Sequence, residues 1–189
     1  MRRSAFDSPG DQWPKLDVVV VPYDPAWAER FEVEEKIIRS VLGSLVNRIE
    51  HFGSTSVPGL AAKPIVDILV ELAAALSPEE RAELARAGYV HVRNVDDPDI
   101  VFLGKGNHEV HMQLVPTGHA GVFTKLAVRD YLRNFPEEAR AYATVKCAVS
   151  ESAKGVAKDY ALGKRAFVDA LEARAVAWAM GSGAGRTPD

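Results

Sequence analysis

The sequence predicts an α/β (α+β) protein, with a mixed β-sheet and helices followed by a C-terminal helical half. Between residues 17 and 116, short runs of β-branched and apolar residues alternate with stretches of helical periodicity. After Pro116 the apolar residues recur only at helical spacing. The chain has 189 residues, 47% of them hydrophobic, which is enough for one domain with a core.

The first half begins with a β-branched run and a helix that Asp24 and Pro25 are suited to start. A second helix, 77–89, opens with a capping box formed by Ser77 and Glu80, and Gly88 ends it. Strands are predicted over 17–22, 48–53, 65–72, 89–92, 99–104 and 108–116, and helices over 23–46, 77–89, 120–135, 136–152 and 156–180.

The domain plan is one domain, 17–178, with an α/β half over 17–116 and a helical half over 117–178. Residues 1–16 and 179–189 are expected to be flexible tails. The single cysteine, Cys147, excludes a disulfide within the chain, suits a cytoplasmic protein and is expected to be buried. No apolar run is long enough for a membrane span. The net charge of −3 argues against general nucleic-acid binding.

Asp67 stands out because it lies inside the apolar strand "IVDILVEL", where a carboxylate is costly unless it faces a cleft, a metal or a donor. Upstream, Gly53 and Ser54 follow the strand "RIEHF", and twelve residues separate Ser54 from Asp67. Glycine permits a tight turn and a close backbone approach to a ligand, and serine supplies a hydroxyl. The two features together indicate a ligand-binding site.

This arrangement resembles the nucleotidyltransferase superfamily, which has the DNA polymerase β-like fold. The segments "VVVPYDPAWAERFEVE", "IEHFGSTSVPGLAAKPIVDILVE", "RDYLRNFPEEARAYATVK" and "YALGKRAF" resemble, in this order, the GrpB family of that superfamily. The resemblance covers about residues 18–175. It implies a Gly-Ser turn that holds nucleotide phosphates and aspartates that bind magnesium. Some members of the family are fused to dephospho-CoA kinase.

The superfamily supplies a second aspartate two residues after the first, and here that position is Leu69. Leucine cannot bind a metal ion, which puts the standard mechanism in doubt. Glu71 is too far along the strand and is expected to be a surface charge. The strand "HEVHMQLVP" offers Glu109 and His111 instead. Asp67 and His111 are the predicted catalytic residues, and Asp67, Glu109 and His111 the predicted metal ligands.

The predicted metal is a divalent ion, magnesium or manganese, with zinc as the alternative. The other interpretation is that Asp67 and His111 only contact each other across adjacent strands. Neighbouring histidines show no spacing typical of a metal site, so His91, His108 and His119 are expected at the surface.

The phosphate-binding turn is predicted to consist of Gly53, Ser54, Thr55 and Lys63. From the helical half, the resemblance adds Arg129, Arg133, Lys146 and Lys164. Arg129 and Arg133 lie four apart on one helix face, as a phosphate clamp requires. The alternative for these two arginines is ion pairing with Asp130 or the glutamates that follow. The alternative for Lys63 is an ordinary solvated position.

Together these features predict a nucleotidyltransferase-like protein that binds a nucleotide triphosphate or another polyphosphate, with a CoA-related ligand as one option. With a divalent metal it would transfer a nucleotidyl or phosphoryl group to a small acceptor. The alternative is a catalytically inactive nucleotide- or phosphate-binding module, and a third is an interaction domain. The sequence leaves the acceptor, the base, the metal and the oligomeric state open.

Overall fold

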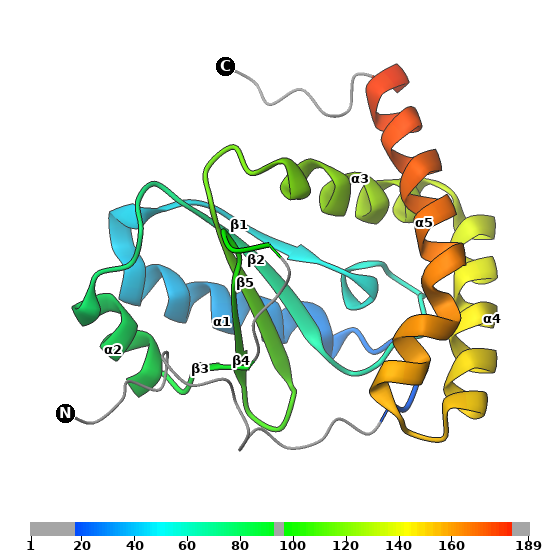
Figure 1. The fold of residues 1–189 in the computed structure, drawn as a ribbon, viewed down its shortest axis with the longest axis horizontal. Coiled ribbons are helices and arrows are strands. Elements are labelled where there is room, and N and C mark those ends of the chain that lie inside the picture. The colour runs from blue at the N-terminus through cyan, green and yellow to red at the C-terminus, as the bar shows by residue number, and fades with distance from the viewer. Residues whose placement is uncertain (1–17, 93–96, 183–189) are drawn as a thin grey trace. The chain divides into compact units, whose positions relative to one another are not determined.

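The computed structural model describes residues 18–92 and 97–182 (Figure 1). The predicted tail 1–16 and residues 183–189 of the other tail lie outside the described residues. Residues 179–182, which were also expected to be tail, continue the last helix. No helix among the described residues is long and apolar enough to cross a membrane.

A five-stranded sheet carries the α/β half, in the order β1-β2-β5-β4-β3. The central pair β2 and β5 is parallel, whereas β4 runs antiparallel to β5 and β3 antiparallel to β4. The mixed sheet and the helices that follow it confirm the predicted fold class. The strands are β1 (Val46–Phe52), β2 (Val66–Leu72), β3 (Val90–His91), β4 (Val101–Lys105) and β5 (Val110–Pro116).

The predicted strand over 17–22 is wrong for its described part. Only Val21 pairs there, in an isolated antiparallel bridge with Ala62. Prolines at positions 22 and 64 bound the two partners, and proline has no N–H with which to extend a ladder. The β-branched composition was therefore a misleading signal at this point of the chain.

The contacts divide the chain into two compact units. Of the described residues, unit 1 contains 26–51 and 65–119, apart from 93–96, and unit 2 contains 18–25, 52–64 and 120–182. The boundary at 119–120 lies close to the expected change at 116–117. Unit 2 differs from the expected helical half because it also takes 18–25 and 52–64, the second of which contains the Gly-Ser turn.

Unit 1 contains the sheet strands and the helices α1 (Ala26–Leu42) and α2 (Pro78–Arg86). The predicted capping box is present, since Ser77 Oγ accepts from the Glu80 N–H and Glu80 Oε2 accepts from the Ser77 N–H. Trp27 and Ile38 of α1 are buried. Glu34 on the same helix is also buried and is 2.8 Å from Lys105 Nζ, with the Tyr89 hydroxyl donating to it at 2.5 Å.

Unit 2 contains the helices α3 (Ala120–Asn134), α4 (Pro136–Ala153) and α5 (Ala157–Ser182), which Figure 1 shows in chain order. Lys154 and Gly155 turn the chain between α4 and α5 with positive φ values of 46° and 83°. The two helices approach closely at Gly163, where a Cβ would lie 2.6 Å from Val149 Cγ1. Cys147 on α4 is exposed, so the expectation that it is buried is wrong.

Candidate functional site

The register of the two parallel strands in unit 1 places Asp67 of β2 directly beside His111 of β5. Asp67 Oδ1 lies 3.9 Å from His111 Nδ1, and the two side chains are 31% and 14% exposed. The predicted pair of a carboxylate and an imidazole is therefore brought together by the sheet. Leu69, at the position of the missing acid, is buried and aligns with Gln113.

His108 joins this pair, and the expectation that it lies at the surface is wrong. Its side chain is buried, and its Nδ1 lies 3.1 Å from His111 Nε2, so one ring nitrogen donates to the other. Residues three apart on a regular strand point to opposite faces. Here β5 begins only at Val110, and His108 has a φ of 61°, which turns its ring back toward His111. Strand periodicity could not reveal this contact.

Glu109 does not complete a metal site with Asp67 and His111. It is exposed, and its carboxylate folds toward Gly106, where a Cβ would lie 2.6 Å from Oε2. Among residues 18–92 and 97–182, no group of three or more His, Cys, Asp or Glu side chains is placed to hold a metal ion. The metal prediction for Asp67, Glu109 and His111 gains no support from this geometry.

Glu71 is not the surface charge that the sequence suggested. It is buried, lies 3.3 Å from Arg48 Nε and accepts a hydrogen bond from the Gly118 N–H at 3.1 Å. These partners tie the end of β2 to the residues after β5. The carboxylate of Glu71 therefore has a structural role. His91 and His119 are half-buried, and His119 Nε2 contacts Asp97 Oδ2 at 2.9 Å.

The Gly-Ser turn of unit 2 is a tight, internally bonded structure. Gly53 has a φ of 72°, a value that favours glycine, and the short 3₁₀ helix Ser54–Ser56 follows it. Ser56 Oγ donates to the Gly53 carbonyl at 2.6 Å, and Thr55 is buried. The predicted turn is thus present, although its hydroxyls at 55 and 56 are largely enclosed.

Two of the predicted phosphate-binding cations hold the loop that follows this turn. The Arg133 guanidinium donates to the Ser56 carbonyl from Nη2 at 2.7 Å and from Nε at 3.1 Å. Lys146 Nζ donates to the Ala61 carbonyl. The loop is thereby anchored at both ends by cations that bind uncharged carbonyl oxygens.

Three lysines from three segments of unit 2 gather around two tyrosines, and we call Lys63, Lys146 and Lys164 the lysine cluster. Lys63 Nζ lies 5.4 Å and Lys164 Nζ 5.2 Å from the centroid of the Tyr160 ring. Lys146 Nζ lies 4.5 Å from the centroid of the Tyr142 ring. Aromatic faces attract cations, so the rings partly offset the repulsion between the ammonium groups.

Lys146 is the most unusual member of the lysine cluster because only 2% of its surface is exposed. Burial first, and then the charges of Lys164 and Lys63, together lower its pKa from 10.5 to about 7. In the described part of the chain, no carboxylate forms an ion pair with Lys146. A bound anion would supply the missing negative charge.

The two arginines expected to form a phosphate clamp have acidic and backbone partners. Arg129 Nε donates to Asp130 Oδ1 at 2.7 Å, and Arg133 Nη1 lies 3.8 Å from the same oxygen. The alternative of ion pairing with Asp130 is therefore present in the structure. The lysine cluster is the better-placed cationic site of unit 2, and its members are distant in sequence, so spacing alone could not group them.

The fold is that of a mixed α/β protein with a cluster of three lysines in unit 2. Comparisons with known proteins give its family. Residues 17–174 match the model of the family described as GrpB protein. The chain is 36% identical over 180 residues to a UPF0157 protein of Pseudomonas aeruginosa, covering 89% of this chain and 73% of that one. The chain belongs to the GrpB family.

Solved structures agree with this assignment. The crystal structure of GrpB from Enterococcus faecalis has a TM-score of 0.76 and 32% identity, covering 84% of this chain and 97% of that chain. A cytoplasmic RNA terminal U-transferase has a TM-score of 0.47 and 12% identity over 72% of this chain and 41% of that one, which is too low to indicate an activity. Among the relatives by sequence, a dephospho-CoA kinase of Mycobacterium bovis is 28% identical to this chain. The match covers 85% of this chain and 46% of the kinase.

Proposed function

We propose that this GrpB-family protein binds a phosphate-rich small molecule, a nucleotide or another polyphosphate, through the lysine cluster. The observation that carries the proposal is the burial of Lys146 beside Lys63 and Lys164. A cation that shifts its pKa this far without an acidic partner is a feature of functional sites more than of cores. The ligand would supply the charge that the protein omits.

The number of lysines favours a ligand with several negative charges. One orthophosphate matches the charge of one or two ammonium groups, whereas a chain of phosphates can contact three ammonium groups at once. Lys63 and Lys164 both make cation–π contacts with the Tyr160 ring, which brings two of the three ammonium groups to one aromatic side chain. A triphosphate or a similar polyanion therefore fits the site better than a single phosphate.

Nucleotidyl or phosphoryl transfer is the second candidate function, and the contact between Asp67 and His111 favours it. A carboxylate beside an imidazole is a common acid–base arrangement. Asp67 and His111 alone would leave most positions of a six-coordinate magnesium ion to water or to the ligand, and the described residues of unit 1 form no group of three metal ligands. If transfer occurs, Asp67→Asn should abolish turnover while leaving ATP binding in unit 2 unchanged.

Isothermal titration calorimetry at pH 7 tests the binding function with ATP, tripolyphosphate, orthophosphate and adenosine. ATP and tripolyphosphate should bind in the absence of metal, and adenosine and orthophosphate should bind at least about tenfold more weakly. Lys164→Gln should weaken ATP binding by about tenfold, the loss expected for one charge-assisted contact.

The matched control is Lys158→Gln, an exposed lysine near the start of the same helix α5. Its ATP affinity should equal that of the wild type. Equal losses in both lysine variants would show only a general effect of net charge. No binding of any polyphosphate by the folded wild type would reject the proposed function.

A further inference from the structure

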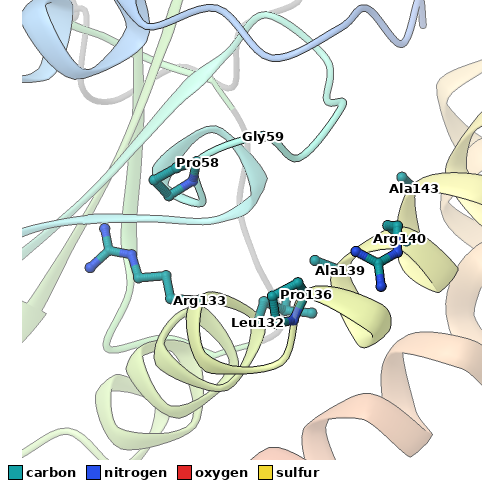
Figure 2. A pocket seen from close by; sticks show the side chains of 8 residues that line it. All are labelled: Pro58, Gly59, Leu132, Arg133, Pro136, Ala139, Arg140 and Ala143. Carbon is teal, nitrogen blue, oxygen red and sulfur yellow. The ribbon is translucent and has the colours of Figure 1, made fainter.

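Unit 2 also contains a cavity of about 680 Å³ whose lining residues are not those of the lysine cluster (Figure 2). It lies between the tip of the loop after the Gly-Ser turn and the corner at which α3 passes into α4. Pockets that enclose small molecules commonly measure about 300–1,000 Å³. Its size therefore suits one small ligand.

One wall of the cavity is a face of α4. Pro136, Ala139, Arg140 and Ala143 recur at helical spacing and line the cavity together with Leu132 from the end of α3. Four of these five residues are apolar, and the alanines leave the volume that longer side chains would fill. The body of the ligand should accordingly be apolar.

The opposite wall is a pre-formed turn. The Leu60 N–H donates to the Val57 carbonyl at 3.1 Å, and Gly59 has a φ of 78°, as the third position of a type II turn after Pro58 requires. Arg133 holds Ser56 just before this turn, and Lys146 holds Ala61 just after it. The wall is fixed without a ligand, which lowers the entropy cost of binding.

Among the described residues that line the cavity, the charged ones are two arginines, and both are positive. Figure 2 shows their guanidinium groups at opposite ends of the row of labelled side chains. Arg133 is already bound to the Ser56 carbonyl, whereas Arg140 is exposed on α4. Arginine binds carboxylate and phosphate oxygens with two parallel hydrogen bonds.

We propose that this cavity is a second binding site, for small molecules with an apolar ring or short-chain body and one acidic group that Arg140 binds. The apolar walls would enclose the body, and the acidic group would lie at the rim. The proposal does not depend on polyphosphate binding, since none of the three clustered lysines lines the cavity.

Titration calorimetry with 1-naphthyl phosphate, 1-naphthol and inorganic phosphate tests the site. The naphthyl phosphate should bind most tightly because only this probe satisfies both the walls and the arginine. Ala143→Leu should fill the cavity and weaken its binding by about tenfold. Ala141→Leu on the exposed side of α4 is the matched control and should bind as the wild type does.

Arg140→Gln should weaken naphthyl phosphate binding by about tenfold and leave naphthol binding unchanged. Arg165→Gln, an exposed arginine of α5, controls for net charge. Thermal unfolding of each variant verifies the fold. Absence of naphthyl phosphate binding, or binding that Ala143→Leu and Arg140→Gln both leave unchanged, would overturn the proposal. Binding that Lys164→Gln alone weakens would assign the probe to the lysine cluster and overturn it equally.

Discussion

Among the described residues, each unit has one buried charged side chain on a helix, but only the one in unit 1 has a partner of opposite charge. In unit 1, Glu34 of α1 is 7% exposed and meets the ammonium of Lys105 and the hydroxyl of Tyr89. In unit 2, Lys146 of α4 is 2% exposed and meets a carbonyl oxygen, an aromatic ring and the charges of two further lysines.

We infer from this difference that the charge of Glu34 stabilises the fold, whereas the charge of Lys146 can bind a ligand. Removing a buried charge from water costs several kcal/mol unless a partner compensates for it. Unit 1 contains the compensating partner, so Glu34 is satisfied within the protein. The described residues of unit 2 do not give Lys146 an acidic partner, and the lowered pKa of Lys146 reflects that cost.

The largest expected loss of stability follows from removing the compensated charge. Glu34→Gln leaves Lys105 without its carboxylate and should lower the free energy of unfolding by about 3 kcal/mol, because one partner of a buried pair is removed. Urea unfolding followed by circular dichroism measures the change. A loss below about 0.5 kcal/mol would mean that the pair contributes nothing to the fold. ATP affinity should not change in this variant.

Lys146→Met should raise the free energy of unfolding at low pH, and this gain should disappear as the pH rises. Between the folded pKa of about 7 and the ordinary value of 10.5, the unfolded chain binds a proton that the folded chain does not. Wild-type stability should therefore rise with pH across this window, by up to about 1.4 kcal/mol per pH unit.

The methionine variant should accordingly be more stable than the wild type at pH 6 and lose that advantage between pH 7 and 10. Urea titrations at pH 6, 8 and 9.5 measure the difference. An advantage that stays constant over this range would contradict the lowered pKa. The variant should also lose ATP binding.

Gly163→Ala tests whether the spacing of α4 and α5, which carry Lys146 and Lys164, matters for the site. The new methyl group would lie 2.6 Å from Val149 Cγ1, so the Val149 side chain must turn or the helices must move apart. Overpacking of this kind should cost about 1–2 kcal/mol of stability. ATP affinity should fall as well. A variant as stable as the wild type would show that the helix pair adapts freely.

The smallest effect is expected for Arg129→Gln. Arg129, like Glu34, has an opposite charge beside it, since Asp130 lies at 2.7 Å. Its loss should change ATP affinity less than twofold and stability by about 0.5 kcal/mol at most. Titration calorimetry beside Lys164→Gln makes the comparison. A tenfold loss of ATP affinity in Arg129→Gln would instead support the prediction that Arg129 binds phosphate.

Much of the fold was predictable because local signals agree with it. The alternation in "HEVHMQLVP" located β5, and the Ser77–Glu80 capping box located the start of α2. Contact between Asp67 and His111 across adjacent strands was one of the interpretations of the sequence, and the register of β2 and β5 places the two residues side by side. The same signals failed at 17–22, where β-branched residues have too short a partner to form a strand.

The site was less predictable because it depends on contacts distant in sequence. His108 reaches His111 only through a left-handed residue before the strand begins, which periodicity cannot anticipate. The lysine cluster draws on the loop after the Gly-Ser turn, on α4 and on α5, and only the packing of unit 2 reveals that Lys146 is buried. Sequence could name Lys63 from the turn and the other two lysines through the resemblance, but it could not rank them above the arginines.

Proton uptake on ligand binding tests the central claim most directly. At pH 8, most of the Lys146 amine is neutral, and the ATP phosphates are ionised. A polyanion bound beside the amine should raise its pKa and draw a proton from the buffer. Calorimetry of metal-free ATP in two buffers with different ionisation enthalpies measures this proton. We predict an uptake approaching one proton for the wild type and none for any residual binding by Lys146→Met. ATP binding without proton uptake in the wild type would contradict the claim that the lysine cluster is the anion site.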